Sequence, residues 1–193
     1  VLHDVIGGDV EIEKFCGGKC ALDIGSSTGG FTDCLLTYGV AHVDAVDVGT
    51  AQLHSRLQSN DKISLYENTD IRKFTSTTTY SIIVADLSFI PLENIFNEII
   101  TFGIAGTSYF LLIKPQFEVG KGNTKKGIVK SSDLVEKILC KYRKIANDNL
   151  SLALDTGASH TVIDLSTLLL AGYNLQDSIG TVSLETANGA VNA

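Results

Sequence analysis

The sequence predicts an α/β domain built on a mostly parallel β-sheet. Three observations lead to this prediction. Short apolar runs alternate along the chain with stretches of helical character, a glycine-rich turn follows the first apolar run, and a polar residue stands at or just after the end of each run. Such alternation is typical of βαβ units, in which helices join parallel strands.

The expected elements follow one another at short intervals. Apolar runs that suit strands occupy five segments, at 20–24, 42–47, 62–66, 80–85 and 108–113. Helical patterns fall between or after them, at 29–38, 50–58, 91–101 and 131–147. Ligands of open parallel sheets bind beyond the carboxyl ends of the strands, so functional residues should stand where strands end.

The composition fits one such domain with a smaller second segment. The chain has 193 residues, 44% of them hydrophobic and 19% charged, and a net charge of −7. No apolar run reaches the roughly 18 residues of a membrane-spanning helix, so we expect no membrane partner. The four cysteines form no C-x-x-C pair, so we expect no metal site, and reduced thiols indicate a cytoplasmic protein. Because the first residue is not Met, the chain looks like a segment of something longer.

The turn after the first apolar run has the character of a cofactor-binding loop. Glycines at positions 25, 29 and 30 allow a close approach of the backbone to a ligand, and the amides of the following helix face that ligand. The turn matches neither G-x-G-x-x-G nor a phosphate-binding loop, and Asp23 ends the strand, which suits a cationic amino group. A tight strand-to-helix connection without a ligand is the alternative.

Further polar residues end the other expected strands. Asp47, Asp70, Asp86 and Lys114 follow the second to fifth runs, and together with Asp23 they predict a single pocket. Asp47 is placed for ribose hydroxyls and Asp70 for an adenine amino group. Asp86 and Lys114 form a pair suited to deprotonation of a hydroxyl. Each carboxylate could instead cap a helix, and the pair could be a structural salt bridge.

Five motifs stand in order between residues 15 and 145. They are Asp23-Ile-Gly-Ser-Ser-Thr-Gly-Gly-Phe-Thr-Asp-Cys-Leu-Leu, Ala45-Val-Asp-Val-Gly, Asn68-Thr-Asp-Ile-Arg, Asp86-Leu-Ser-Phe-Ile and Lys114-Pro-Gln-Phe-Glu. Their order and spacing resemble those of the haemolysin-A-like (TlyA) ribosomal RNA methyltransferases, relatives of the FtsJ 2′-O-methyltransferases.

The resemblance implies a Rossmann-like fold and methyl transfer from S-adenosylmethionine to a ribose 2′-hydroxyl of RNA. Lys114 and Asp86 would be catalytic. The cofactor would be held by Asp23, Gly25, Ser26, Ser27, Thr28, Gly29, Gly30, Asp47, Asp70 and Asp86. Nine basic and three acidic residues lie between Lys114 and Lys144, and the resemblance makes this window an RNA-facing surface that includes Lys121, Lys125, Lys126 and Lys130. On charge alone, a solvated helix face explains the window equally well.

The resemblance also implies a Lys-Asp-Lys-Glu tetrad around the 2′-hydroxyl. Asp86 and Lys114 match its second and third members. Residues 1–14 have no lysine at the place of the first, and the closing glutamate would fall after residue 150, where the resemblance stops. An alternative function is therefore that of a catalytically incomplete relative that binds RNA or the ribosome.

The last quarter of the chain has a different character. Residues 148–193 contain Asp155-Thr-Gly-Ala-Ser between two apolar runs and resemble part of a retropepsin-like aspartic peptidase. The resemblance implies that Asp155 would activate water, which requires a homodimer because the chain has a single Asp-Thr-Gly. We therefore expect a methyltransferase domain over 1–147 and a partial peptidase-like segment over 148–193, with a dimeric peptidase as a third possible function.

Overall fold

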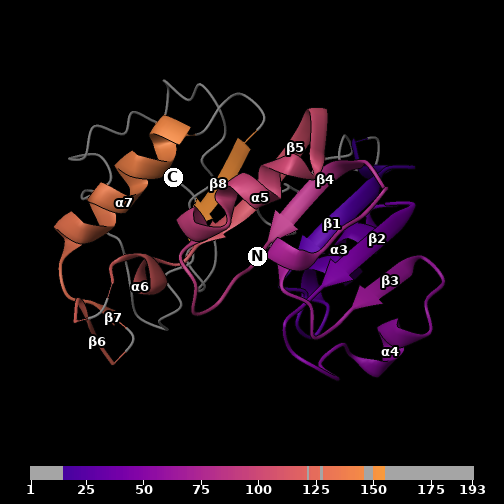
Figure 1. Cartoon of the computed structure of the whole chain (residues 1–193), viewed down its shortest axis with the longest axis horizontal. Helices are drawn as coiled ribbons and strands as arrows, with labels where there is room; N and C mark the ends of the chain where they lie inside the picture. The colour runs from indigo at the N-terminus through magenta and orange to yellow at the C-terminus, as the bar shows by residue number, and fades with distance from the viewer. Residues whose placement is uncertain (1–14, 121, 127, 146–149, 155–193) are drawn as a thin grey trace, which may run out of the picture.

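The computed structural model describes residues 15–120, 122–126, 128–145 and 150–154. Its centre is a six-stranded sheet in which every neighbouring pair of strands is parallel, as Figure 1 shows. The order is β3-β2-β1-β4-β5-β8. The strands are β1 (Cys20–Ile24), β2 (His42–Val46), β3 (Ile63–Tyr66), β4 (Tyr80–Ala85), β5 (Gly103–Ile113) and β8 (Leu150–Leu154). The prediction of a mostly parallel sheet is confirmed.

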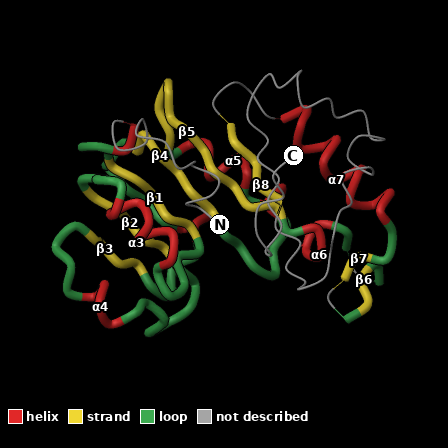
Figure 2. The backbone as a smooth tube through the Cα atoms, turned by 180° about the vertical axis from the view of Figure 1, so that it is seen from behind, coloured by secondary structure: helices red, strands yellow, loops and turns green. Residues whose placement is uncertain are grey.

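Helices and short turns connect these strands. They are α3 (Gly30–Thr37), α4 (Ser55–Gln58), η1 (Ile71–Lys73), η2 (Leu92–Asn94), α5 (Phe96–Thr101), α6 (Pro115–Glu118) and α7 (Ser132–Ile145). An antiparallel hairpin of β6 (Thr124–Lys125) and β7 (Ile128–Val129) lies between α6 and α7. The views in Figures 1 and 2 place α3 and α5 on opposite faces of the sheet.

The sheet buries both of its faces, and the alternation of side chains along β4 shows how. Ile83 and Ala85 belong to an apolar cluster that includes Ile99 of α5, whereas Ile82 and Val84 belong to a second cluster with Leu35 of α3. Successive side chains of a strand point to opposite faces, so one strand serves both layers. Continuous apolar runs are therefore the expected signature of these strands.

The chain changes direction between β1 and β4. It builds β1, β2 and β3 outward toward one edge and then returns to place β4 on the other side of β1. The loops after β1 and β4 consequently diverge to opposite sides of the sheet. In folds of this kind, the crevice that opens between such loops holds the ligand.

Two expected helices are shorter or divided in the structure. The stretch 50–58 is helical only over Ser55–Gln58, because the residues before it form a loop in which the amide of His54 donates to the carbonyl of Thr28. The stretch 91–101 is divided at Ile95 into η2 and α5. Local periodicity does not reveal such tertiary contacts.

The strand β8 changes the expected division of the chain. Leu150–Leu154 pairs in parallel with β5, with Ile113 opposite Leu154, so this strand extends the main sheet. The expected boundary between residues 147 and 148 lies just before this strand of the sheet. Residues 155–193, including Asp155, lie outside the described part of the chain.

Candidate active site

A cavity of about 480 Å³ opens at the carboxyl end of the sheet. This volume is within the range of small-ligand sites. Five of the residues predicted for the cofactor line it, namely Gly25, Ser27, Asp47, Asp70 and Asp86. Pairing of Ile24 with both Val46 and Ala85 brings these loops together, since the residues that follow three adjacent strands start at one level.

The glycine-rich loop follows β1 and is shaped by two glycines in the left-handed region. Gly25 has φ +80°, and a Cβ there would lie 2.5 Å from the carbonyl oxygen of Asp86. Gly29 has φ +94°, and a Cβ there would lie 2.4 Å from a methyl group of Leu57. Any larger side chain would separate this loop from β4 or from α4. Gly30 is the first residue of α3 and meets no such restriction.

Asp47 holds the glycine-rich loop to the loop after β2. Its Oδ2 accepts from the amide of Ser27 at 2.8 Å, and its Oδ1 accepts from the amide of Gly49 at 2.6 Å. Ser27 itself has φ +48° and is exposed. A carboxylate oxygen can accept more than one hydrogen bond, so Asp47 remains able to bind ribose hydroxyls at the cavity.

Asp23 and Ser26 lie beneath this loop. The Asp23 side chain is fully buried, and its Oδ2 accepts from Thr32 Oγ1 at 2.6 Å. Within the described residues, Asp23 Oδ1 and Ser26 Oγ have no hydrogen-bond partner. Burial raises the pKa of Asp23 to about 7, and the nearby charges of Asp86 and Asp47 act in the same direction. Neither Asp23 nor Ser26 is among the residues that line the cavity, so the structure does not place Asp23 in the wall of the predicted pocket.

Asp70 lines the cavity and also caps η1. Its Oδ1 accepts from the amide of Arg72 at 3.0 Å, and its Oδ2 lies 2.5 Å from the Arg72 guanidinium. Hydrogen bonds from Arg72 lower the pKa of Asp70 to about 2. The capping alternative therefore describes Asp70 correctly, while its place in the cavity wall also fits the expected contact with an adenine amino group.

Asp86 and Lys114 meet at the other end of the cavity. The Lys114 Nζ lies 2.5 Å from Asp86 Oδ1 and 3.4 Å from Ser88 Oγ. The exposed fraction of the side chain is 14% for Lys114 and 35% for Asp86. Asp86 lines the cavity directly, whereas Lys114 does not line it and contacts the site through Asp86. The pair predicted from two strand ends is therefore present and remains open to solvent on one side.

Phe89 is a candidate residue that the analysis of the sequence did not single out. Its side chain is 90% exposed and lines the cavity, and its backbone adopts φ +68°. Its ring lies 5.2 Å from that of Phe117, measured between centroids. The sequence contains a pattern that could have identified Phe89, since both aromatic residues stand three positions after a predicted catalytic residue, in Asp86-Leu-Ser-Phe and Lys114-Pro-Gln-Phe.

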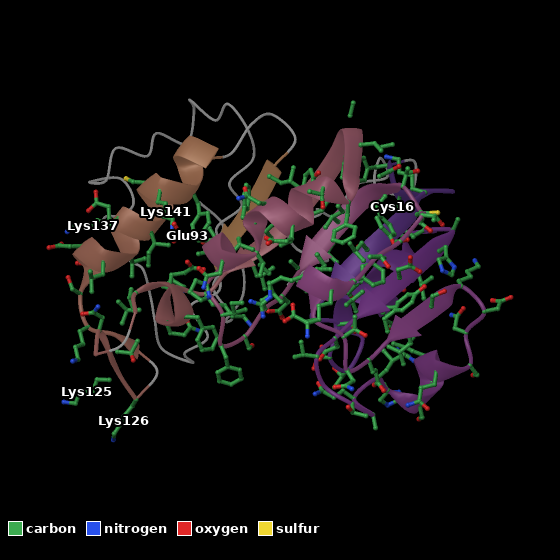
Figure 3. The ribbon with its side chains drawn as sticks, in the orientation of Figure 1. Cys16, Glu93, Lys125, Lys126, Lys137 and Lys141 are labelled. Atoms are coloured by element: carbon green, nitrogen blue, oxygen red, sulfur yellow. The ribbon has the colours of Figure 1, made fainter. Side chains whose placement is uncertain are left out.

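The expected RNA-facing lysines lie beyond this site, around the β6–β7 hairpin. Lys125 and Lys126 are exposed there, and Figure 3 shows both pointing away from the body of the domain. Lys130 is exposed as well and donates to the carbonyl oxygen of Gly122 at 2.5 Å. Lys121 lies outside the described residues. Thr28, which was expected at the cofactor, is exposed and contributes its carbonyl to the contact with His54.

The fold and the site together define the class of protein. A parallel sheet of this order, a glycine-rich loop after β1, an acidic residue after β2 and a Lys/Asp pair after β4 and β5 are the features of a Rossmann-like S-adenosylmethionine-dependent methyltransferase. The model of the FtsJ-like methyltransferase family matches residues 8–158, and the chain belongs to this family.

Known relatives agree with this assignment. The 23S rRNA (cytidine-2′-O)-methyltransferase TlyA of Campylobacter jejuni is 44% identical over 128 residues, which cover 65% of this chain and 50% of that protein. The 16S/23S rRNA (cytidine-2′-O)-methyltransferase TlyA of Mycobacterium tuberculosis is 38% identical over 128 residues, covering 65% and 48%. The chain thus spans about half the length of these relatives.

The chain is also similar to a solved structure. That of a candidate hemolysin from Streptococcus thermophilus is similar with a TM-score of 0.64 and 36% identity, over 69% of this chain and 50% of that one. Nothing in the comparisons supports the peptidase interpretation of residues 148–193, and the family match includes Asp155. Among the described residues, no helix has the length and apolar character needed to cross a membrane.

The residues of the cavity fit S-adenosylmethionine, the cofactor of this class of methyltransferase. The buried Asp23 and Ser26 have unmet polar atoms and stand next in sequence to Ile24, Gly25 and Ser27, which line the cavity, while the absence of a side chain at Gly25 lets this loop lie against the Asp86 carbonyl. The neighbouring Asp47 suits a ribose and Asp70 an amino group. A cation is favoured here because the carboxylates of Asp47, Asp70 and Asp86 line one cavity.

Proposed function

We propose that this protein methylates a ribose 2′-hydroxyl of ribosomal RNA, with S-adenosylmethionine as the methyl donor. The observation that carries the proposal is the contact of 2.5 Å between Lys114 and Asp86 at the rim of the cofactor cavity. A ribose hydroxyl is a weak nucleophile, and a positioned amino group helps to remove its proton. The family and its rRNA-modifying relatives support this choice of substrate.

The chain's own residues divide the work of the reaction. The bound cofactor supplies the methyl group from its sulfonium. Lys114 would orient the ribose hydroxyl and receive or relay its proton as the new O–C bond forms and the bond between the methyl group and the sulfonium sulfur breaks, with the thioether product as the leaving group. Asp86 holds the Lys114 Nζ in place at a distance of 2.5 Å. Holding both reactants in one geometry supplies a further part of the rate.

Two surface features support an RNA substrate. The exposed ring of Phe89, packed against Phe117 at the mouth of the cavity, offers a face on which an unstacked base can lie. The exposed lysines at 125, 126 and 130 supply positive charge that can bind phosphates of the RNA backbone. We further propose that the protein acts in the cytoplasm, where ribosomes are found.

The alternative is a relative that binds cofactor and RNA but transfers no methyl group. The lysine that would complete the tetrad is expected within residues 1–14, outside the described residues, and the glutamate is expected after residue 150, where the resemblance stops. An experiment therefore has to distinguish this alternative from an active methyltransferase. It predicts cofactor binding without product in the unmodified protein.

The test is a methylation assay with radiolabelled S-adenosylmethionine and ribosomal RNA or ribosomal subunits, followed by detection of 2′-O-methylated nucleotides. We expect Lys114→Ala and Asp86→Ala each to lower the rate by about a hundredfold or more, as is usual for removal of a general base or its partner. Lys62→Ala, which removes an exposed lysine before β3, is the matched control and should retain the rate. Equal rates in all these proteins would contradict the proposed roles.

A further inference from the structure

The loop after β4 is held at its far end by two side chains from distant parts of the sequence. This loop ends in η2, whose N-cap residue is Pro91 and has no side-chain cap. Instead, the amide of Leu92 donates to Glu118 Oε1 at 2.7 Å, and the amide of Glu93 donates to the Tyr142 hydroxyl at 2.9 Å. The Tyr142 hydroxyl donates in turn to Glu118 Oε2 at 2.8 Å. We call this set of contacts the η2 clamp.

The η2 clamp also reaches Lys114. Helix α6 begins directly after Lys114, ends at Glu118, and is anchored to Lys114 because the amide of Phe117 donates to the Lys114 carbonyl at 2.8 Å. Glu118 therefore links the backbone that carries Lys114 to the loop that carries Asp86. The contact between Lys114 Nζ and Asp86 Oδ1 closes this ring of contacts on the side of the cavity.

The η2 clamp contains a buried side chain, whereas the neighbouring ion pair of Glu93 and Lys141 is open to solvent. Tyr142 is fully buried, and burial together with the Glu118 carboxylate raises the pKa of its hydroxyl, so the hydroxyl remains a donor. Glu93 and Lys141 form an ion pair on the outside of the same region, as Figure 3 shows. The side chain of Glu93 is 61% exposed, so solvent screens that pair. A buried polar network with satisfied partners holds its members more firmly.

The cofactor-binding loops depend on a separate set of contacts. The glycine-rich loop is fixed by Asp47 and by the carbonyl of Val46, which accepts from the amide of Gly25 at 2.8 Å. None of the contacts of the η2 clamp involves these residues. Loss of the clamp should therefore affect the reacting pair more than the hold on the cofactor, because Asp86 is the one expected cofactor residue in the loop that the clamp holds, whereas Gly25, Ser27, Asp47 and Asp70 lie in other loops of the cavity wall.

We propose that Glu118 and Tyr142 are positioning residues for methyl transfer, which hold the loop of Asp86 and Phe89 against Lys114. This inference rests on the proposed function, since it assumes that Asp86 and Lys114 are the reacting pair. Glu118 and Tyr142 do not line the cavity themselves, and they act through the groups that they hold. Small displacements of reacting groups lower rates strongly, because productive geometry is narrow.

The first test separates the rate of reaction from cofactor binding. In Tyr142→Phe and Glu118→Ala, we expect the single-turnover rate at saturating RNA and cofactor to fall by about tenfold or more, while the Kd for S-adenosylmethionine changes by less than about threefold. Glu118→Gln keeps an oxygen for the amide of Leu92 and should recover part of the rate. Glu93→Gln, which weakens only the exposed ion pair, is the matched control and should react normally.

The second test does not depend on activity. Hydrogen exchange should become faster at Leu92 and Glu93 in Tyr142→Phe, while a peptide covering residues 23–30 exchanges as in the unmodified protein. Unchanged exchange at η2, an unchanged rate, or an equal loss in Glu93→Gln would overturn the inference. If the unmodified protein methylates no RNA, the proposed function fails, and the exchange measurement still decides whether the clamp holds the loop.

Discussion

Asp23 is a carboxylate that the native fold buries completely, and replacing it by asparagine should change how stability depends on pH. Burial raises its pKa from 3.8 to about 7, so the native protein keeps this proton at a pH where the unfolded chain has already lost it. Uptake of a proton by the native state alone favours folding. This contribution is complete at low pH and is lost as the pH rises from about 4 to about 7.

The magnitude follows from the difference in pKa. A pH of about 5 lies about two units below the pKa of the native carboxyl, and each unit corresponds to about 1.4 kcal/mol. About 3 kcal/mol of stability is therefore present at this pH, and nearly all of it is lost by about pH 8. Asparagine is neutral throughout and can still accept from Thr32. We therefore expect the unfolding free energy of the unmodified protein to fall relative to that of Asp23→Asn by this amount.

Urea unfolding of both proteins at the two pH values provides the measurement. Comparing the two proteins cancels every other titrating group, because they differ at one position. Asp61→Asn changes an exposed carboxylate and should leave the pH dependence of stability unaltered. If Asp23→Asn and the unmodified protein lose or gain stability in parallel between the two pH values, the burial argument is wrong. Asp23→Asn should also bind S-adenosylmethionine more weakly above about pH 7, since it removes a buried negative charge close to Asp47 and Asp86, which line the cavity.

Two further predictions concern the loop and the basic surface. Gly25→Ala should lower the affinity for S-adenosylmethionine by about tenfold or more in a calorimetric titration, because a Cβ at φ +80° would lie 2.5 Å from the Asp86 carbonyl. The control is Gly18→Ala, which also changes a glycine at positive φ but has open space around it, and it should bind normally. The double change Lys125→Ala and Lys126→Ala should weaken RNA binding and reduce the slope of log K against log salt by about 1.5, as expected for two lost phosphate contacts, and an unchanged slope would remove these lysines from the interface.

The sequence predicted β1, β2 and β4 well because each is a mostly apolar run that is buried on both faces. It placed the start of β5 late, at residue 108 instead of Gly103. The pairing with β4 is irregular there, passing from Tyr80–Gly103 to Ile82–Ser108, and Gly106 adopts φ +88°. A glycine-containing segment with an irregular register has no regular alternation, so pattern alone could not include it.

The location of the candidate site was predictable, but the partners of its residues were not. A parallel sheet places its strand ends together, and this rule brought Asp47, Asp70 and Asp86 to one cavity. It did not show that Asp70 pairs with Arg72 or that both oxygens of Asp47 accept loop amides. Rotamers and loop paths decide those contacts, and neither follows from the spacing of residues.

The structure also shows why binding and reaction can be altered separately in this fold. Gly25, Ser27 and Asp47 line the cavity from the loops after β1 and β2, while Asp86 and Lys114 follow β4 and β5 and are braced by Glu118 and Tyr142. The two halves meet where the missing side chain of Gly25 lets its loop lie against the Asp86 carbonyl. A change at Gly25 should therefore disturb both halves, whereas changes at Asp23 or at Tyr142 should each disturb mainly one.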